Sequence, residues 1–113
     1  MGPLLDERRL REQSGAPRPE LFRDIARRWI ADVPDAVGRI RGAPPRDLAA
    51  ALHELRSGAV AVGLTELPGA LAAIEQGVER GRPAEPDDLA AALALAERSA
   101  AALGHFWEAA AAY

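Results

Sequence analysis

Apolar residues recur along the chain at intervals of three and four, the spacing that places side chains on one face of an α-helix. Gly, Pro, Asp and Thr residues that typically begin or end helices separate these segments. The pattern predicts a short opening helix and four principal helices, over about residues 3–13, 19–41, 45–63, 66–81 and 87–110. Abundant Ala, Leu, Arg and Glu also favour helix. We therefore expect an all-α fold, an antiparallel four-helix bundle with an N-terminal capping helix, formed as one domain over residues 1–113.

The segment that follows Pro19 has an apolar stripe interrupted by a proline. Pro34 lies inside this stripe, and a proline within a helix removes one hydrogen bond and clashes with the preceding turn, so we expect a kink or a break there. The aromatic residues Phe22 and Trp29 both lie on the stripe, which favours core packing over partner binding. The stripe consists of Leu21, Phe22, Ile25, Trp29, Val33, Val37 and Ile40.

The next segment carries His53, one of two histidines in the chain. At about 100° per residue, His53 projects roughly 140° away from the centre of the apolar stripe and should stand in solvent. Arg56 and Ser57 follow one turn later on the same side, and the apolar Val60 follows two turns later. The stripe consists of Leu48, Leu52, Leu55, Ala59 and Val62.

Two glycines, Gly58 and Gly63, lie in or near the histidine helix. Each costs on the order of 1 kcal/mol of helix stability relative to alanine. A cost of this size suggests that another backbone approaches closely at these positions. Thr65 is a candidate N-cap for the helix that follows.

Composition excludes several functional classes. The formal net charge is −3 and the arginines are spread along the chain, so no basic face for nucleic acid is expected. The chain has no cysteine and only two distant histidines, which makes a metal site improbable. No apolar run reaches membrane-spanning length, and we expect a cytoplasmic protein that does not bind membranes. Nothing marks His105 as a site, and we interpret it as structural or surface-exposed.

The order His53-x-Leu55-Arg56-Ser57-Gly58-Ala59, with Gly63 ten residues after the histidine, resembles the core of histidine-containing phosphotransfer domains, which carry His-x-Leu-Lys-Gly-Ser-Ala. The resemblance covers about residues 19–106 and includes the pair Ile74-Glu75 in the downstream helix. The chain departs from the family at two positions. Arg56 replaces the usual lysine, in a chain without any lysine, and Ser57 stands where the family has glycine.

The resemblance implies a phosphocarrier and not an enzyme. His53 would accept a phosphoryl group and relay it between aspartates of receiver domains in a two-component phosphorelay. The expected partners are a response-regulator receiver domain, a hybrid sensor histidine kinase, or both, and the receiver would supply Mg²⁺. The chain itself should need no cofactor and should be monomeric. Arg56 and Ser57 are candidate neighbours of the phosphoryl group, and Ala49, Ser57 and Val60 are candidate docking residues.

Two alternatives stay open at this point. His53-Glu54-Leu55-Arg56 also matches the phosphoacceptor box of histidine-kinase dimerisation helices, but Gly58 stands where that box has proline and no ATP-binding domain follows. The other alternative is a helical adaptor that binds a receiver or a kinase without being phosphorylated. Replacing His53 by glutamine separates the adaptor from a phosphocarrier, because an adaptor would keep its activity and a carrier would lose it.

Overall fold

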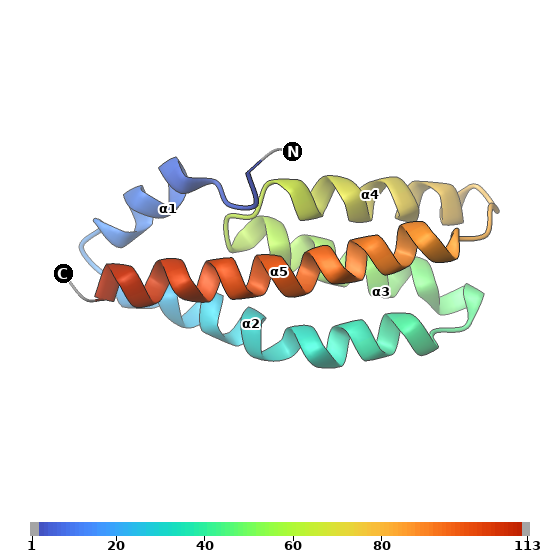
Figure 1. The fold of residues 1–113 in the computed structure, drawn as a ribbon, viewed down its shortest axis with the longest axis horizontal. Coiled ribbons are helices and arrows are strands. Elements are labelled where there is room, and N and C mark those ends of the chain that lie inside the picture. Colours follow the sequence, from blue (N-terminus) through green and yellow to red (C-terminus); the bar gives the residue numbers. More distant parts are fainter. Residues whose placement is uncertain (1–2, 112–113) are drawn as a thin grey trace.

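The computed structural model describes residues 3–111, and this part of the chain contains five α-helices (Figure 1). The prediction of an all-α fold is confirmed. The only β pairing among the described residues is an isolated bridge between Leu5 and Leu64. No helix in this range is both long and apolar enough to cross a membrane. The helices are α1 (Glu7–Ser14), α2 (Pro19–Gly42), α3 (Pro45–Ala61), α4 (Glu66–Glu79) and α5 (Pro86–Ala111).

The two longest helices, α2 and α5, extend along the long axis of a molecule that measures 47 × 26 × 19 Å. With 17 and 14 residues, α3 and α4 are shorter than α2 and α5, which have 24 and 26. At 1.5 Å per residue, α2 and α5 therefore exceed α3 and α4 by roughly 10–18 Å. The excess length lies at the end of the molecule that α1 occupies (Figure 1).

The core is formed by the predicted apolar stripes of the four principal helices. Each stripe contributes large side chains that are almost completely buried, and α1 adds one, Leu10. Burial of this apolar surface is the main favourable contribution to folding. The largest fully buried apolar side chains are Leu10, Ile40, Leu52, Leu67, Leu71, Leu93 and Leu103.

The predicted start of the opening helix at residue 3 is wrong. Asp6 is the N-cap of α1, and its carboxylate accepts a hydrogen bond from the backbone N–H of Arg9. Residues 3–6 are extended instead, because their backbone pairs with the turn between α3 and α4. The N–H of Asp6 donates to the carbonyl of Gly63 at 2.8 Å, and the N–H of Thr65 donates to the carbonyl of Leu4 at 3.1 Å.

The side chain of Arg9 reaches from α1 to the C-terminal end of α3. Its guanidinium donates to the carbonyl of Val60 at 2.8 Å and to the carbonyl of Ala61 at 3.1 Å. The last carbonyls of a helix have no partner within the helix and carry its partial negative charge. Arg9 therefore caps the helix that carries His53 from a distant part of the sequence.

Two expectations for α2 can be compared with the structure. One helix spans Pro34, so the alternative of a break is wrong; the ring lies on the exposed side, while Val33 and Val37 are buried on the other. The second concerns the start of the stripe. Trp29 is buried as predicted, but Phe22 is 38% exposed, together with its neighbours Leu21 and Ile25. These residues belong to the part of α2 that the shorter helices do not cover.

Gly58 and Gly63 are required for different physical reasons. The predicted approach of another backbone is found at Gly63, whose carbonyl accepts from the N–H of Asp6, but the close neighbour of Gly58 is a side chain. A Cβ on Gly58 would lie 2.6 Å from Cδ1 and 2.8 Å from Nε1 of Trp29, so an indole ring takes the space. Gly63 has a φ of +88° in the turn after α3, a conformation that L-residues rarely adopt. A Cβ there would also lie 3.0 Å from a methyl group of Leu10.

Candidate functional site

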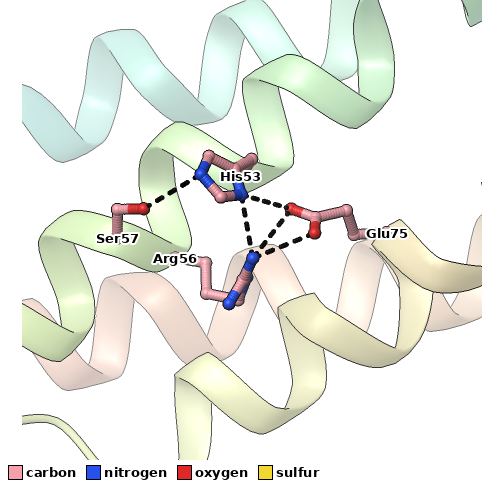
Figure 2. A network of polar contacts seen from close by, with 4 residues as sticks. All are labelled: His53, Arg56, Ser57 and Glu75. Carbon is pink, nitrogen blue, oxygen red and sulfur yellow. Dashed lines mark hydrogen bonds and ion pairs between the residues drawn. The ribbon is translucent and has the colours of Figure 1, made fainter. Parts of the chain in front are cut away.

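His53 lies on α3 with its side chain exposed to solvent, as the helical spacing predicted. The side chain is 60% exposed, whereas its neighbours Leu52 and Leu55 are buried in the core. The imidazole is held by side chains from two helices, Arg56 and Ser57 on α3 and Glu75 on α4 (Figure 2). The ring is therefore accessible and oriented at the same time.

The Nδ1 side of the imidazole faces a buried carboxylate. Nδ1 lies 3.2 Å from Oε1 of Glu75 and 2.8 Å from Nη2 of Arg56 (Figure 2). The same Nη2 donates to Oε2 of Glu75 at 3.0 Å. The Glu75 side chain is only 7% exposed, whereas that of Arg56 is 29% exposed. A buried carboxylate needs a charge partner and hydrogen-bond donors, and Arg56 supplies both.

The contacts of Nδ1 fit either neutral tautomer of His53. Arginine can only donate and a carboxylate can only accept, so Nδ1 either accepts from Arg56 at 2.8 Å or donates to Oε1 of Glu75 at 3.2 Å. In the second case the proton lies on Nδ1 and the lone pair lies on Nε2.

Nε2 is on the side of the ring that faces away from Glu75 and Arg56. Its nearest polar group is the hydroxyl of Ser57, with Oγ at 3.4 Å (Figure 2). The two predicted neighbours of the phosphoryl group thus lie on different sides of the ring. Arg56 faces Nδ1 and pairs with Glu75, and Ser57 faces Nε2. A group bound to Nε2 would meet the serine hydroxyl first.

The predicted docking residues differ in accessibility. Val60 is 48% exposed and Ser57 is exposed, whereas Ala49 is half-buried. All three lie on α3 within two turns of His53. The other histidine, His105, is exposed on α5 and has no polar side-chain contact among residues 3–111.

Glu75 is the site residue that the sequence interpretation did not single out for a role. It was named only in the pair Ile74-Glu75, as part of the family resemblance. In the structure, Glu75 is buried with Leu67 and Leu71, while Ile74 is only partly covered. The positions 67, 71, 75 and 78 also follow helical spacing. The sequence signal that could have identified Glu75 is its position, because a carboxylate there continues an apolar stripe.

Within the described residues, no group of three or more His, Asp or Glu side chains is placed to hold a metal ion. The site is thus a single imidazole with a buried carboxylate, a guanidinium and a hydroxyl around it. Comparison of the chain with protein-family models, with curated proteins and with solved structures gave no match.

Proposed function

We propose that this chain is a histidine phosphotransfer protein that carries a phosphoryl group on Nε2 of His53. The observation that carries the proposal is the pairing of an exposed imidazole with a buried carboxylate, 3.2 Å from Nδ1 to Oε1 of Glu75. This arrangement orients the ring, and in the tautomer that we propose, with the proton on Nδ1 beside Glu75, the Nε2 lone pair faces solvent. The resemblance of residues 53–63 to the phosphotransfer motif supports the same function.

The proposed donor is an aspartyl phosphate on a response-regulator receiver domain. The lone pair of Nε2 attacks phosphorus, the N–P bond forms, and the P–O bond to the aspartate breaks as the carboxylate leaves. The ring gains positive charge in this step, and the Glu75 carboxylate beside the Nδ1 proton stabilises that charge electrostatically. Transfer to a second receiver reverses the step. The receiver supplies Mg²⁺ and the acidic pocket, so this chain contributes the nucleophile and a docking face.

Ser57 and Arg56 have separate tasks in this proposal. The hydroxyl of Ser57, 3.4 Å from Nε2, donates a hydrogen bond to a phosphoryl oxygen once the group is attached. Arg56 neutralises Glu75 and so keeps a second negative charge from facing the incoming phosphoryl group. The exposed Val60 lies at the centre of the proposed docking face, with Ala49 at its edge.

The finer architecture is also part of the proposal. We infer that α2–α5 form an antiparallel four-helix bundle with α1 as a cap. The short connections between α2 and α3 and between α3 and α4 support it. Five helices in one chain also favour a monomeric carrier over a kinase dimerisation hairpin, which completes its bundle with a second copy.

The test is phosphoryl transfer from a panel of phosphorylated receiver domains with Mg²⁺. The native protein and the matched control His105→Gln should gain an acid-labile, alkali-stable label, and His53→Gln should gain none. Equal labelling of His53→Gln would contradict the proposal. A complete absence of label, with receiver binding retained by both native protein and His53→Gln, would instead indicate the adaptor.

A second variant, Glu75→Gln, tests the role of the carboxylate. The glutamine amide can donate to Nδ1 as well as accept from it, and it carries no charge to pair with Arg56. The tautomer and the orientation of the His53 ring should therefore be less well defined. Loss of groups that orient a functional imidazole commonly costs about 10–100-fold, and we expect a slower transfer rate of this order. The ¹⁵N chemical shifts of His53 report the tautomer independently of the rate. An unchanged Nδ1–H population would show that Glu75 does not select it.

A further inference from the structure

The groove between α2 and α3 contains a cavity on the flank of α3 that faces away from Glu75. Its volume is about 210 Å³. The cavity exists because small residues, Ala36 on α2 and Ala51 and Gly58 on α3, face each other across the groove. There is room for one long side chain from outside.

The polar groups of this cavity have no partners within residues 3–111. Asp32 on α2 and Glu54 on α3 both line it, and neither makes an ion pair within this range. The indole of Trp29 is only 9% exposed, and none of the side-chain hydrogen bonds in the range includes its N–H. Its Nε1 edge lies over Gly58, which also lines the cavity.

This set of groups has the chemistry to recognise a basic residue. Two carboxylates attract a guanidinium or ammonium group, and the apolar walls suit the methylene stem of such a side chain. The indole N–H can donate to a backbone carbonyl of the same residue. The cavity also includes Arg39, which follows Asp32 by seven residues, roughly 10 Å along α2. The acidic end is therefore the end where the basic side chain would bind.

The cavity is close to the phosphoacceptor. Glu54 directly follows His53 and lies about 100° further around α3, and Gly58 follows Ser57 in the same way. A partner placed over Nε2 therefore covers the exposed face of α3, where His53 and the cavity lie on adjacent sides of the helix.

We propose that the receiver domain that docks over His53 inserts an arginine or lysine side chain between Asp32 and Glu54. This inference rests on the proposed phosphotransfer function and adds a determinant of partner choice to it. Charge pairs at the rim of an interface favour correct partners and discriminate against wrong ones more than they add affinity. Receivers with an acidic or apolar residue at the matching position would leave the two carboxylates unpaired.

The first test uses a small probe and needs no receiver. The ¹⁵N-labelled protein is titrated with N-acetylarginine amide and, separately, with N-acetylcitrulline amide, a neutral analogue of similar shape. We expect the indole N–H signal of Trp29, identified with Trp29→Phe, to shift with the arginine probe alone. The double variant Asp32→Asn/Glu54→Gln should lose this response, whereas Asp35→Asn, exposed on α2 outside the cavity, should keep it. Equal responses to the two probes would overturn the cation site.

The second test uses any receiver that phosphorylates His53. Loss of two partly exposed ion pairs should weaken its binding by roughly threefold to tenfold in the double variant, with no change for Asp35→Asn. Unchanged affinity in the double variant, with transfer to His53 intact, would overturn this inference and leave the proposed function standing. Absence of transfer from every receiver would remove the proposed function, and with it the receiver as occupant, whatever the arginine titration shows.

Discussion

At the scale of single residues, the sequence predicts the exposure of His53 but not its contact with Glu75. The exposure of His53 follows from helical spacing alone, because the buried stripe of its helix is regular. The contact with Glu75 does not, because it depends on how α3 and α4 are rotated against each other. A charged residue on an apolar stripe is ordinarily read as a solvated neighbour of that stripe. Only its burial, at 7% side-chain exposure, reveals the partner.

The glycines of the chain show the same limit. Gly58 and Gly38 both lie within helices, and the sequence gives no reason to treat them differently. In the structure, a Cβ on Gly58 meets the Trp29 indole, whereas a Cβ on Gly38 meets nothing within 4 Å. The prediction of a close approach at Gly58 was therefore right about the proximity and wrong about a backbone being its cause.

This difference predicts opposite effects of the same substitution. Gly58→Ala should lower the free energy of unfolding by up to about 2 kcal/mol, because strain of about 1–3 kcal/mol offsets or exceeds the gain of about 1 kcal/mol in helix propensity. Gly38→Ala should raise it by about 0.5–1 kcal/mol. Urea denaturation of both variants measures the two changes. A stabilising Gly58→Ala would mean that the indole moves aside without cost.

At the scale of helices, the sequence predicted the number and the approximate limits of the elements. The errors lie where distant segments determine local structure. Pro3, Leu4 and Leu5 suit the start of a helix, but the backbone of residues 3–6 pairs with the turn around Gly63 and Thr65. A break at Pro34 was one of two expected outcomes, but one helix spans the proline, with Val33 and Val37 buried before and after it. In both cases tertiary contacts outweigh local preference.

The cap that Arg9 places on α3 gives a prediction for this element. Arg9→Ala removes the guanidinium donor from the carbonyls of Val60 and Ala61, of which Val60 keeps the N–H of Gly63, and should lower the free energy of unfolding by about 0.5–1 kcal/mol. Amide hydrogen exchange should accelerate mainly in the last turn of α3. Arg8→Ala is the matched control, because Arg8 makes only an exposed pair with Glu12 and should change stability by less than about 0.5 kcal/mol. Equal effects of the two substitutions would show that the cap contributes nothing.

At the scale of the whole molecule, unequal helix lengths determine which surfaces are covered. The sequence predicts each length approximately, but not that α2 and α5 extend past α3 and α4 at one end. Phe22 was assigned to the core on the pattern of its own helix, and it is 38% exposed at the end of α2 that extends past α3 and α4 (Figure 1). A periodic pattern identifies the face of a helix that can be buried. The lengths of the neighbouring helices determine how much of that face is actually buried.

We expect α1, the short helix at this end, to fold together with the rest of the molecule, and a substitution of Leu10 tests this expectation. Its side chain is fully buried and contacts Gly63 at the end of the histidine helix. Leu10→Ala should lower the free energy of unfolding by about 2–4 kcal/mol, as expected for a buried leucine. Leu21→Ala, at a side chain that is 49% exposed, should have a much smaller effect. A single urea transition with an unchanged slope would show that α1 unfolds with the rest, and two transitions would show that it does not.

The division of the site between α3 and α4 has a consequence for the protein in a cell. His53 and Glu75 are 22 positions apart in the chain and meet only when the two helices are packed together. A nascent, proteolysed or misfolded copy still contains the histidine, but not the paired carboxylate or the surface beside it. Under the proposed function, such copies would accept few phosphoryl groups from receiver domains, and only folded molecules would take part in the transfer.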